Sequence, residues 1–365
     1  MPRMQCMTLA AFALVGGVTA CGSKPPPDYA PDPELVAQIT GINMRAPGRA
    51  CPGQSIRADY EAELADGRAV PFSREYDDEN PPPLHVVFLR RWSQEAVSQE
   101  DGDWNLEDDP LETVMEGFRL TAELKADRSI SVTHVVRPDY SCMPHAFRFD
   151  GRAGRRGEPG GPGPDVLVRL DILSSPFYER LVVASVEVGT APPFYLFQDA
   201  DLVPPSDWLV VESRGGHGGR GLDGASGAAG AAGAAGCPGG SGGAGGAGSN
   251  GGPGAPGGSG GHVTVMAPNE LPYLAGLVDA YGTGGPGGAG GKAGPGGPGG
   301  KGGAATARRC EAGEDGAPGA DGRPGPEGAE GALGPRARVI TVAAADLFPR
   351  PVPPRLQELL DYSHR

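Results

Sequence analysis

Glycine recurs at every third position over most of residues 215–334, and this period constrains the fold more than any other feature of the 365-residue chain. The register is unbroken from Gly215 to Gly260, and it returns in two later runs of eight glycines each. The long run divides at Cys237-Pro238, which leaves four glycine segments of 22 residues: 215–236, 239–260, 282–303 and 313–334. In polyproline II conformation, at about 3.1 Å per residue, each segment is roughly 65–70 Å long.

Equal lengths favour segments that run up and down beside one another within a single chain. The four segments contain eight prolines in 88 residues, fewer than the 15–20% or more that is typical of collagen. They also contain thirteen glycines outside the register, which weaken an isolated triple helix but allow close approach of backbones. The register resembles the glycine-rich polyproline II bundles of certain antifreeze proteins. We therefore expect an intrachain polyproline II bundle over 214–335, with strand-like residues 262–281 returning the chain to its base.

Two alternatives to the intrachain bundle stay open. The first register keeps its phase through Cys237-Pro238, as one continuous rod of a trimeric collagen-like stalk would. The fourth segment, "GEDGAPGADGRPGPEGAEGALG", is also similar to ordinary bacterial collagen-like sequence. A disordered linker is the other possibility.

The N-terminal residues predict a lipoprotein signal peptide over 1–20. Arg3 precedes an apolar run that is too short for a permanent membrane helix, and the run ends in "VTAC". "VTAC" resembles the bacterial lipobox, which implies cleavage before Cys21 and acylation of its thiol. Gly22 after this cysteine implies, in that family, the outer membrane. Residues 21–35 then read as a proline-rich tether.

Four further cysteines suit an oxidising compartment. Four thiols allow three pairings, and grouping by region favours Cys51 with Cys142 and Cys237 with Cys310. Each disulfide would close a long loop and stabilise the fold by roughly 4 kcal/mol in the chain-entropy model.

Residues 36–150 predict a mainly β fold with an antiparallel, immunoglobulin-like sandwich. Several short alternating runs are separated by Gly, Pro and Asp clusters, and "IRADYEAEL" places Ile56, Ala58, Tyr60 and Ala62 on one face. Trp92, between Cys51 and Cys142, loosely matches the tryptophan of that plan. Beyond the sandwich we expect a short glycine-triplet linker at 151–164, additional strands at 165–213, and a terminal strand and tail at 336–365. In the tail, "RLQELLDYSHR" predicts a helix that docks through Leu356, Leu359 and Leu360.

Motifs that would support chemistry are weak. The acidic stretch "DGDWNLEDDPLE" places Asp101, Asp103, Asn105 and Glu112 at calcium-loop positions 1, 3, 5 and 12, but position 6 is Leu106 instead of glycine. No nucleophile, base and orienting group can be assembled from the sequence, so we expect neither catalysis nor a cofactor. The net charge of −14 argues against nucleic acid and anionic lipid headgroups as partners.

Together these features predict a lipid-anchored protein of the cell envelope that serves as a structural spacer or an adhesive surface. It would contact the membrane through the lipid on Cys21 and would be a monomer. The alternative is specific binding of a polysaccharide or an envelope protein by the sandwich.

Overall fold

The computed structural model describes residues 25–348 and 351–365, and the mainly β fold expected from the sequence is confirmed. The signal peptide and Cys21 lie outside the described residues. The described chain divides into two units. Unit 1 comprises residues 25–48, 55–106 and 118–136, and unit 2 comprises 49–54, 107–117 and the described residues from 137 onward.

Unit 1 consists of short strands in antiparallel pairs. They form the sheets β1-β4-β5 and β3-β8-β7, and most of the sheet β2-β10-β9-β6. Its strands and helical turns are α1 (Pro33–Val36), β1 (Ile39–Arg45), β3 (Ser55–Ile56), β4 (Asp59–Leu64), β5 (Ala69–Pro71), η1 (Val86–Phe88), β6 (Leu89–Trp92), β7 (Ala96–Ser98), β8 (Trp104–Leu106), β9 (Phe118–Leu124) and β10 (Ser131–Pro138). β2 (Arg49–Ala50) and the two residues of β10 that pair with it, Arg137 and Pro138, belong to unit 2.

The core of unit 1 follows the alternation in the sequence. The residues expected on one face, Ile56, Ala58, Tyr60 and Ala62, are all buried. Trp104 is fully buried beside them and donates a hydrogen bond from Nε1 to the Tyr60 hydroxyl at 2.8 Å. The core tryptophan is therefore Trp104, and the expectation for Trp92 is wrong, because Trp92 is 45% exposed on β6.

Unit 2 contains a mixed five-stranded sheet, β14-β13-β12-β16-β18, and a three-stranded sheet, β11-β15-β17. All pairs are parallel except β12/β13 and β13/β14. The elements are α2 (Pro110–Thr113), β11 (Ala146–Asp150), β12 (Val166–Ser175), β13 (Tyr178–Val188), β14 (Phe194–Asp199), η2 (Ala200–Leu202), β15 (Leu209–Arg214), β16 (Val263–Pro268), η3 (Pro272–Leu277), β17 (Val278–Thr283), β18 (Arg338–Val342), α3 (Ala344–Leu347) and α4 (Pro354–Ser363).

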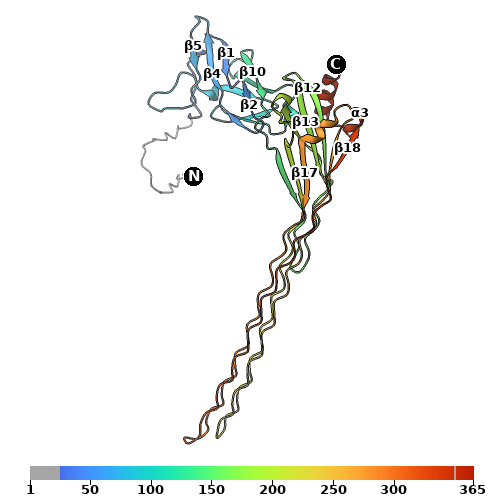
Figure 1. The fold of residues 1–365 in the computed structure, drawn as a ribbon. Helices are drawn as coiled ribbons and strands as arrows, with labels where there is room; N and C mark the ends of the chain where they lie inside the picture. Colours follow the sequence, from blue (N-terminus) through green and yellow to red (C-terminus); the bar gives the residue numbers. More distant parts are fainter. Residues whose placement is uncertain (1–24, 349–350) are drawn as a thin grey trace. The chain divides into compact units, whose positions relative to one another are not determined.

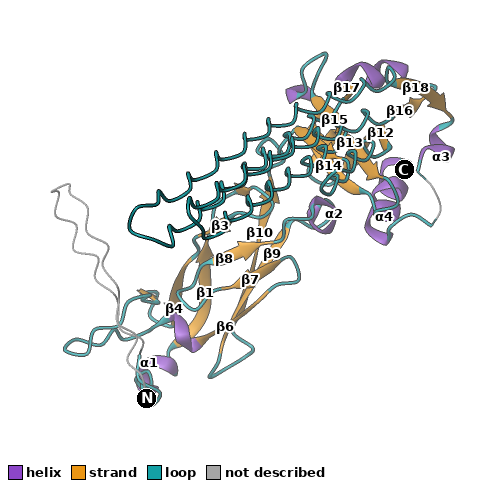
Figure 2. Ribbon diagram, turned by 90° about the horizontal axis from the view of Figure 1, so that it is seen from below, coloured by secondary structure: helices purple, strands orange, loops and turns teal. Residues whose placement is uncertain are grey.

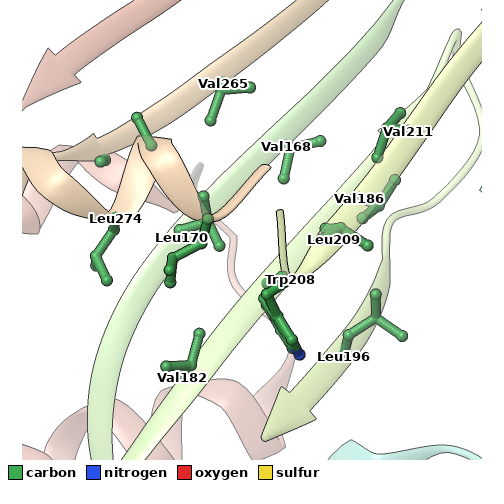
Figure 3. Close-up of a cluster of buried hydrophobic side chains, with 14 of the residues drawn as sticks. Val168, Leu170, Val182, Val186, Leu196, Trp208, Leu209, Val211, Val265 and Leu274 are labelled. Atoms are coloured by element: carbon green, nitrogen blue, oxygen red, sulfur yellow. The ribbon is translucent and has the colours of Figure 1, made fainter. Parts of the chain in front are cut away.

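The two sheets of unit 2 share an apolar core. Side chains of β12, β13, β14 and β16 meet those of β15 and η3, as Figure 3 shows for Leu170, Leu209 and Leu274. A second cluster packs α2, α3 and α4 against the five-stranded sheet. Leu356 and Leu359 of α4 are fully buried there and Leu360 partly, which confirms the docking expected for the terminal helix.

Three successive connections in unit 2 repeat one pattern that the sequence reading missed. Residues 151–165 join β11 to β12, the first two glycine segments join β15 to β16, and the last two join β17 to β18. Each connection therefore leaves the three-stranded sheet and returns to the five-stranded sheet. Because β11, β15 and β17 are neighbours, and so are β12, β16 and β18, the connections are brought side by side at one end of the sheets. Figures 1 and 2 show the glycine segments leaving the strands together.

This arrangement corrects two expected domain boundaries. Residues 137–150 belong to unit 2, not to a sandwich over 36–150, because β11 pairs with β15 across about sixty residues of sequence. Residues 151–164 are not a linker, since they fold back as a hairpin against the first and second glycine segments. Local sequence signals identified the strands, but they carry no information on which distant strand pairs with which.

Candidate functional site

The first and second glycine segments lie parallel to the third and fourth, respectively, and are joined to them by backbone hydrogen bonds. Every register glycine of the first segment donates its N–H to a carbonyl in or directly after the third, at 2.8–3.1 Å, from Gly215→Thr283 to Gly236→Ala304. Every register glycine of the second donates to the fourth or to Glu311 just before it, at 2.8–3.0 Å, from Gly239→Glu311 to Gly260→Ala332. These ladders continue the sheets, since Arg214 and Thr283 are already partners in β15 and β17.

Antiparallel hydrogen bonds join the two layers. The second segment donates to the first from Gly240→Ala234 to Gly258→Gly216, and the third donates to the second from Gly285→Gly258 to Gly303→Gly240. The fourth donates to the third from Gly313→Gly303 to Gly334→Gly282. The second and third segments thus each bond to all three others. In the described chain, no backbone hydrogen bond joins the first segment to the fourth.

Triplets contain a second glycine more often in segments that have more neighbouring segments. Eleven of the thirteen glycines outside the register lie in the second and third segments, which have three neighbours. The other two are Gly216 and Gly219, where the first segment gains a further neighbour, and they donate to Gly161 and Glu158 of the short hairpin. A β-carbon on Gly219 would lie 1.5 Å from the Arg155 carbonyl oxygen. Contacts within one chain therefore require the six extra glycines of the third segment as well as Gly216 and Gly219, because a β-carbon on any of them would lie 1.5–2.1 Å from a backbone carbonyl oxygen.

Register glycines leave no room for a side chain, except at Gly236 beside the turn. A β-carbon on Gly227 would lie 1.9 Å from the Gly246 carbonyl oxygen, and one on Gly245 would lie 2.1 Å from that of Gly297. Most second-position glycines of the second segment are less crowded, since a β-carbon on Gly246 would lie 3.0 Å from its nearest neighbour, the Ala228 nitrogen. Gly258 is the exception, because its β-carbon would lie 1.7 Å from a carbonyl oxygen of the short hairpin. Ser249 and Ala255 occupy equivalent positions and keep the same backbone hydrogen bonds.

Polar side chains bond backbone N–H groups that do not point at a neighbouring carbonyl. The acceptors come from adjacent segments, at 2.7–2.8 Å: Asp223 for Lys292, Asp321 for Gly296, Asp315 for Gly302, Asn250 for Arg323 and the Ser249 hydroxyl for Ala225. The pKa of Asp223 is lowered mainly by the hydrogen bond from the Lys292 backbone N–H. The pKa of Asp315 is lowered mainly by the hydrogen bond from the Gly302 backbone N–H. These short polar side chains thus fix the register of neighbouring segments.

These two carboxylates give a pH prediction. Because their pKa values are lower in the folded chain than the usual value of about 3.9, their contribution to stability is present above about pH 4 and is lost as the pH falls through the folded values. The double variant Asp223→Asn, Asp315→Asn keeps an acceptor oxygen at each position but removes the group that takes up a proton. We therefore expect the acid-induced unfolding of its glycine segments to occur at lower pH. Circular dichroism between pH 6 and pH 2.5 measures it, with Glu330→Gln as the control at another exposed carboxylate. An unchanged acid midpoint in the double variant would contradict the assignment.

Both expected disulfides are present in unit 2. Cys237 and Cys310 are bonded, with Cα atoms 5.1 Å apart, and tie the turn between the first two glycine segments to the turn between the last two. Cys51 and Cys142 are bonded, with Cα atoms 6.3 Å apart. The Cys237–Cys310 disulfide closes the end of the segments that lies away from the sheets, beside a single parallel β-bridge between Gly236 and Ala305.

The residues considered for calcium are engaged elsewhere. Asp101 accepts from the Asp103 backbone N–H at 3.0 Å, and the Asp103 carboxylate pairs with Arg74. Asn105 lies in β8 and accepts from the Ser55 hydroxyl, whereas Glu112 lies in α2 and pairs with Arg355 at 3.5 Å. Within residues 25–348 and 351–365, no three His, Cys, Asp or Glu side chains are grouped to hold a metal ion.

Unit 2 also has an open groove of about 570 Å³ between α2, β14 and the start of α4. Proline and aromatic side chains line it, including Phe147 and Phe194, and Arg355 is paired with Glu112 at its edge. Its lining contains no serine, cysteine or histidine, so it offers no Ser–His or Cys–His pair. None of the helices in the described part of the chain is both long enough and apolar enough to span a membrane.

Comparison with protein-family models, with curated proteins and with solved structures gives no match to this chain.

Proposed function

We propose that this protein is a lipoprotein, anchored through Cys21 to the outer membrane, whose four glycine segments are polyproline II helices that form a stiff bundle within one chain. The bundle serves as a spacer or contact surface of the cell envelope, and unit 1 is a β-sandwich. No cofactor or catalytic step is part of this proposal. The lipobox-like "VTAC" motivates the anchor, and the hydrogen bonds between glycine segments motivate the bundle.

The observation that carries the bundle is that register glycine N–H groups of all four segments bond inside one chain. A polyproline II helix has no internal hydrogen bonds, so its buried backbone groups need partners in neighbouring segments. Here the register glycines from Gly215 to Gly260, and those of the third and fourth segments from Gly285 to Gly334, donate to carbonyls of the same chain. A trimeric collagen-like stalk would instead require the same N–H groups to bond to other chains.

A bundle of this kind suits a mechanical role better than the binding of a small molecule. Its interior contains backbone and no cavity-forming side chains, because glycines fill the contact positions. Outward positions of the first segment carry mostly small residues, with Ala228, Ala231 and Ala234 exposed. The Cys237–Cys310 disulfide prevents the far turns from separating. These features support resistance to bending and to fraying at the far end.

Two measurements test the proposal separately. Labelling with radioactive palmitate and membrane fractionation should show wild-type protein acylated and membrane-bound, whereas Cys21→Ala should be unlabelled and released. Equal labelling and membrane binding of the two chains would contradict the anchor.

Light scattering on the released Cys21→Ala protein tests the bundle. We expect a monomer no heavier than the 37.1 kDa of the whole chain, with an elongated form in small-angle X-ray scattering. A stable trimer that dissociates as the polyproline II circular-dichroism signal melts would show that the collagen-like alternative is right.

A further inference from the structure

One face of the sheet β6-β9-β10 in unit 1 combines an exposed tryptophan with polar side chains. Trp92 pairs with Thr121 across β6 and β9, and Thr121 pairs with Thr133 across β9 and β10. Directly paired residues project from the same face of a sheet, so these three form one row across the strands, about 10 Å long. The opposite face carries the apolar core residues Leu120 and Ala122.

Trp92 is held in place although it is exposed. Its indole Nε1 donates to Glu123 Oε1 at 3.2 Å, and Arg90 donates to the other oxygen of Glu123 at 3.4 Å. Glu123 lies two residues from Thr121 on the same strand face, which fixes the ring beside the row. Exposure of a large aromatic side chain is unfavourable in water, and a fixed, exposed tryptophan is typical of a binding surface.

A shallow hollow of about 230 Å³ adjoins the ring. Gln94, Glu95 and Arg119 line it together with the row of Trp92, Thr121 and Thr133. Glu95 is 1% exposed, accepts from Arg119 at 2.7 Å and is further held by the Ser93 hydroxyl at 3.2 Å. The hydroxyls of Thr121 and Thr133 lie 2.9 Å apart, so they retain acceptor capacity toward the hollow. The hollow therefore offers an apolar wall and fixed donors and acceptors.

The charges on this face cancel. Arg90 is paired with Glu123 and Arg119 with Glu95, so each guanidinium already has a carboxylate partner. An anionic ligand would have to compete with these carboxylates, and a cationic ligand with the guanidinium groups. Ligands without charge face no such competition.

We propose that this face binds a neutral polysaccharide, with a sugar ring stacked on Trp92 and its hydroxyl groups bonded to Gln94, Arg119 and the threonine hydroxyls. A pyranose ring has an apolar C–H face and a rim of hydroxyls, which is the combination that the hollow presents. Glu95 acts as a positioning residue, because it holds Arg119 and is itself nearly inaccessible. The inference goes beyond the anchored spacer and does not depend on acylation of Cys21.

Tryptophan fluorescence gives a direct test, because Trp92 is exposed whereas Trp104 and Trp208, the other two tryptophans of the chain, are 0% and 4% exposed. The Cys21→Ala protein is titrated with soluble neutral glucans, mannans and galactans, and acrylamide quenching of tryptophan is followed. We expect one neutral class to protect Trp92 from quenching and to retard the protein in affinity gels. Trp92→Ala should weaken retardation at least about tenfold, which corresponds to about 1.4 kcal/mol.

Control variants separate this site from other surfaces. Val97→Ala changes an exposed apolar residue of β7 that does not line the hollow, and it should leave retardation unchanged. Gln94→Ala should weaken it without changing the thermal midpoint, as expected for a contact residue and not for a structural one. Absence of protection by any neutral polymer, or equal retardation of wild type and Trp92→Ala, would overturn the proposal, as would protection by a purified envelope protein alone. None of these results bears on the monomer mass or on acylation of Cys21. The spacer proposal is therefore tested separately, by light scattering and by palmitate labelling.

Discussion

Replacing Gly290 by alanine is expected to disrupt the glycine segments, whereas the same change at Gly246 is expected to be tolerated. Both glycines lie outside the three-residue register, so a triple helix would accept alanine at either position. In the structure, a β-carbon on Gly290 would lie 1.9 Å from the Gly325 carbonyl oxygen, whereas one on Gly246 would lie 3.0 Å from its nearest neighbour. The pair therefore separates contacts inside one chain from those of a collagen-like trimer.

The expected size of the Gly290 effect follows from crowding and lost hydrogen bonds. Overpacking costs about 1–3 kcal/mol, and each backbone hydrogen bond opened nearby costs about 0.5–1.5 kcal/mol. We expect Gly290→Ala to destabilise the segments by about 2–4 kcal/mol and Gly246→Ala by less than about 1 kcal/mol. The change in unfolded-chain entropy from Gly to Ala is the same in both variants and cancels in the comparison.

Hydrogen–deuterium exchange of the glycine amides measures this difference residue by residue. Amides around Gly290 and Gly325 should lose protection in Gly290→Ala, while those of the sheets in unit 2 keep theirs. Equal protection in the two variants would contradict the intrachain contacts between the third and fourth segments.

Replacing Leu170 by alanine is expected to loosen the sheets of unit 2 and the glycine segments together. Leu170 is fully buried in the core that joins the two sheets (Figure 3). Removing a buried leucine side chain costs about 2–5 kcal/mol, depending on how far the surroundings collapse. Because hydrogen bonds such as Gly215→Thr283 extend the pairing of β15 with β17, loss of sheet alignment removes the start of the glycine ladder.

Thermal unfolding followed by near-UV and far-UV circular dichroism tests this coupling. In Leu170→Ala, the signals of the sheets and of the glycine segments should shift to lower temperature together. The matched control is Leu222→Ala in the first glycine segment, where the side chain is 62% exposed, and its effect should stay within about 0.5 kcal/mol. A glycine-segment signal that is unchanged in Leu170→Ala would show that the segments hold their arrangement without the sheets.

Local sequence patterns determined much of the architecture. The alternation of Ile56, Ala58, Tyr60 and Ala62 predicted a buried strand face, and the spacing of Leu356 and Leu359 predicted the inner side of the terminal helix. Grouping the cysteines by region predicted both disulfides. The equal lengths of the four glycine segments were also visible. Each of these features depends on residues within one element, or on a coarse division of the chain, and both can be read directly from the sequence.

Pairing between distant strands was decided only by the tertiary structure. β11 was assigned to the first domain and residues 151–164 to a linker, because nothing in "HAFRFDG" indicates that its partner is β15. Because strand partners cannot be read from the sequence, the three strand–glycine–strand repeats could not be predicted either. Nor could the reason for the extra glycines at Gly216 and Gly219, which bond to the short hairpin. Nor could alternation along β6 tell that Trp92, and not Trp104, remains exposed, since exposure depends on which sheet face is covered. The hydrophobic period and the glycine spacing specify which side of a segment can be buried. Which partner buries that side depends on long-range packing, because joining residues far apart in sequence costs chain entropy that only the contacts of the whole fold can offset.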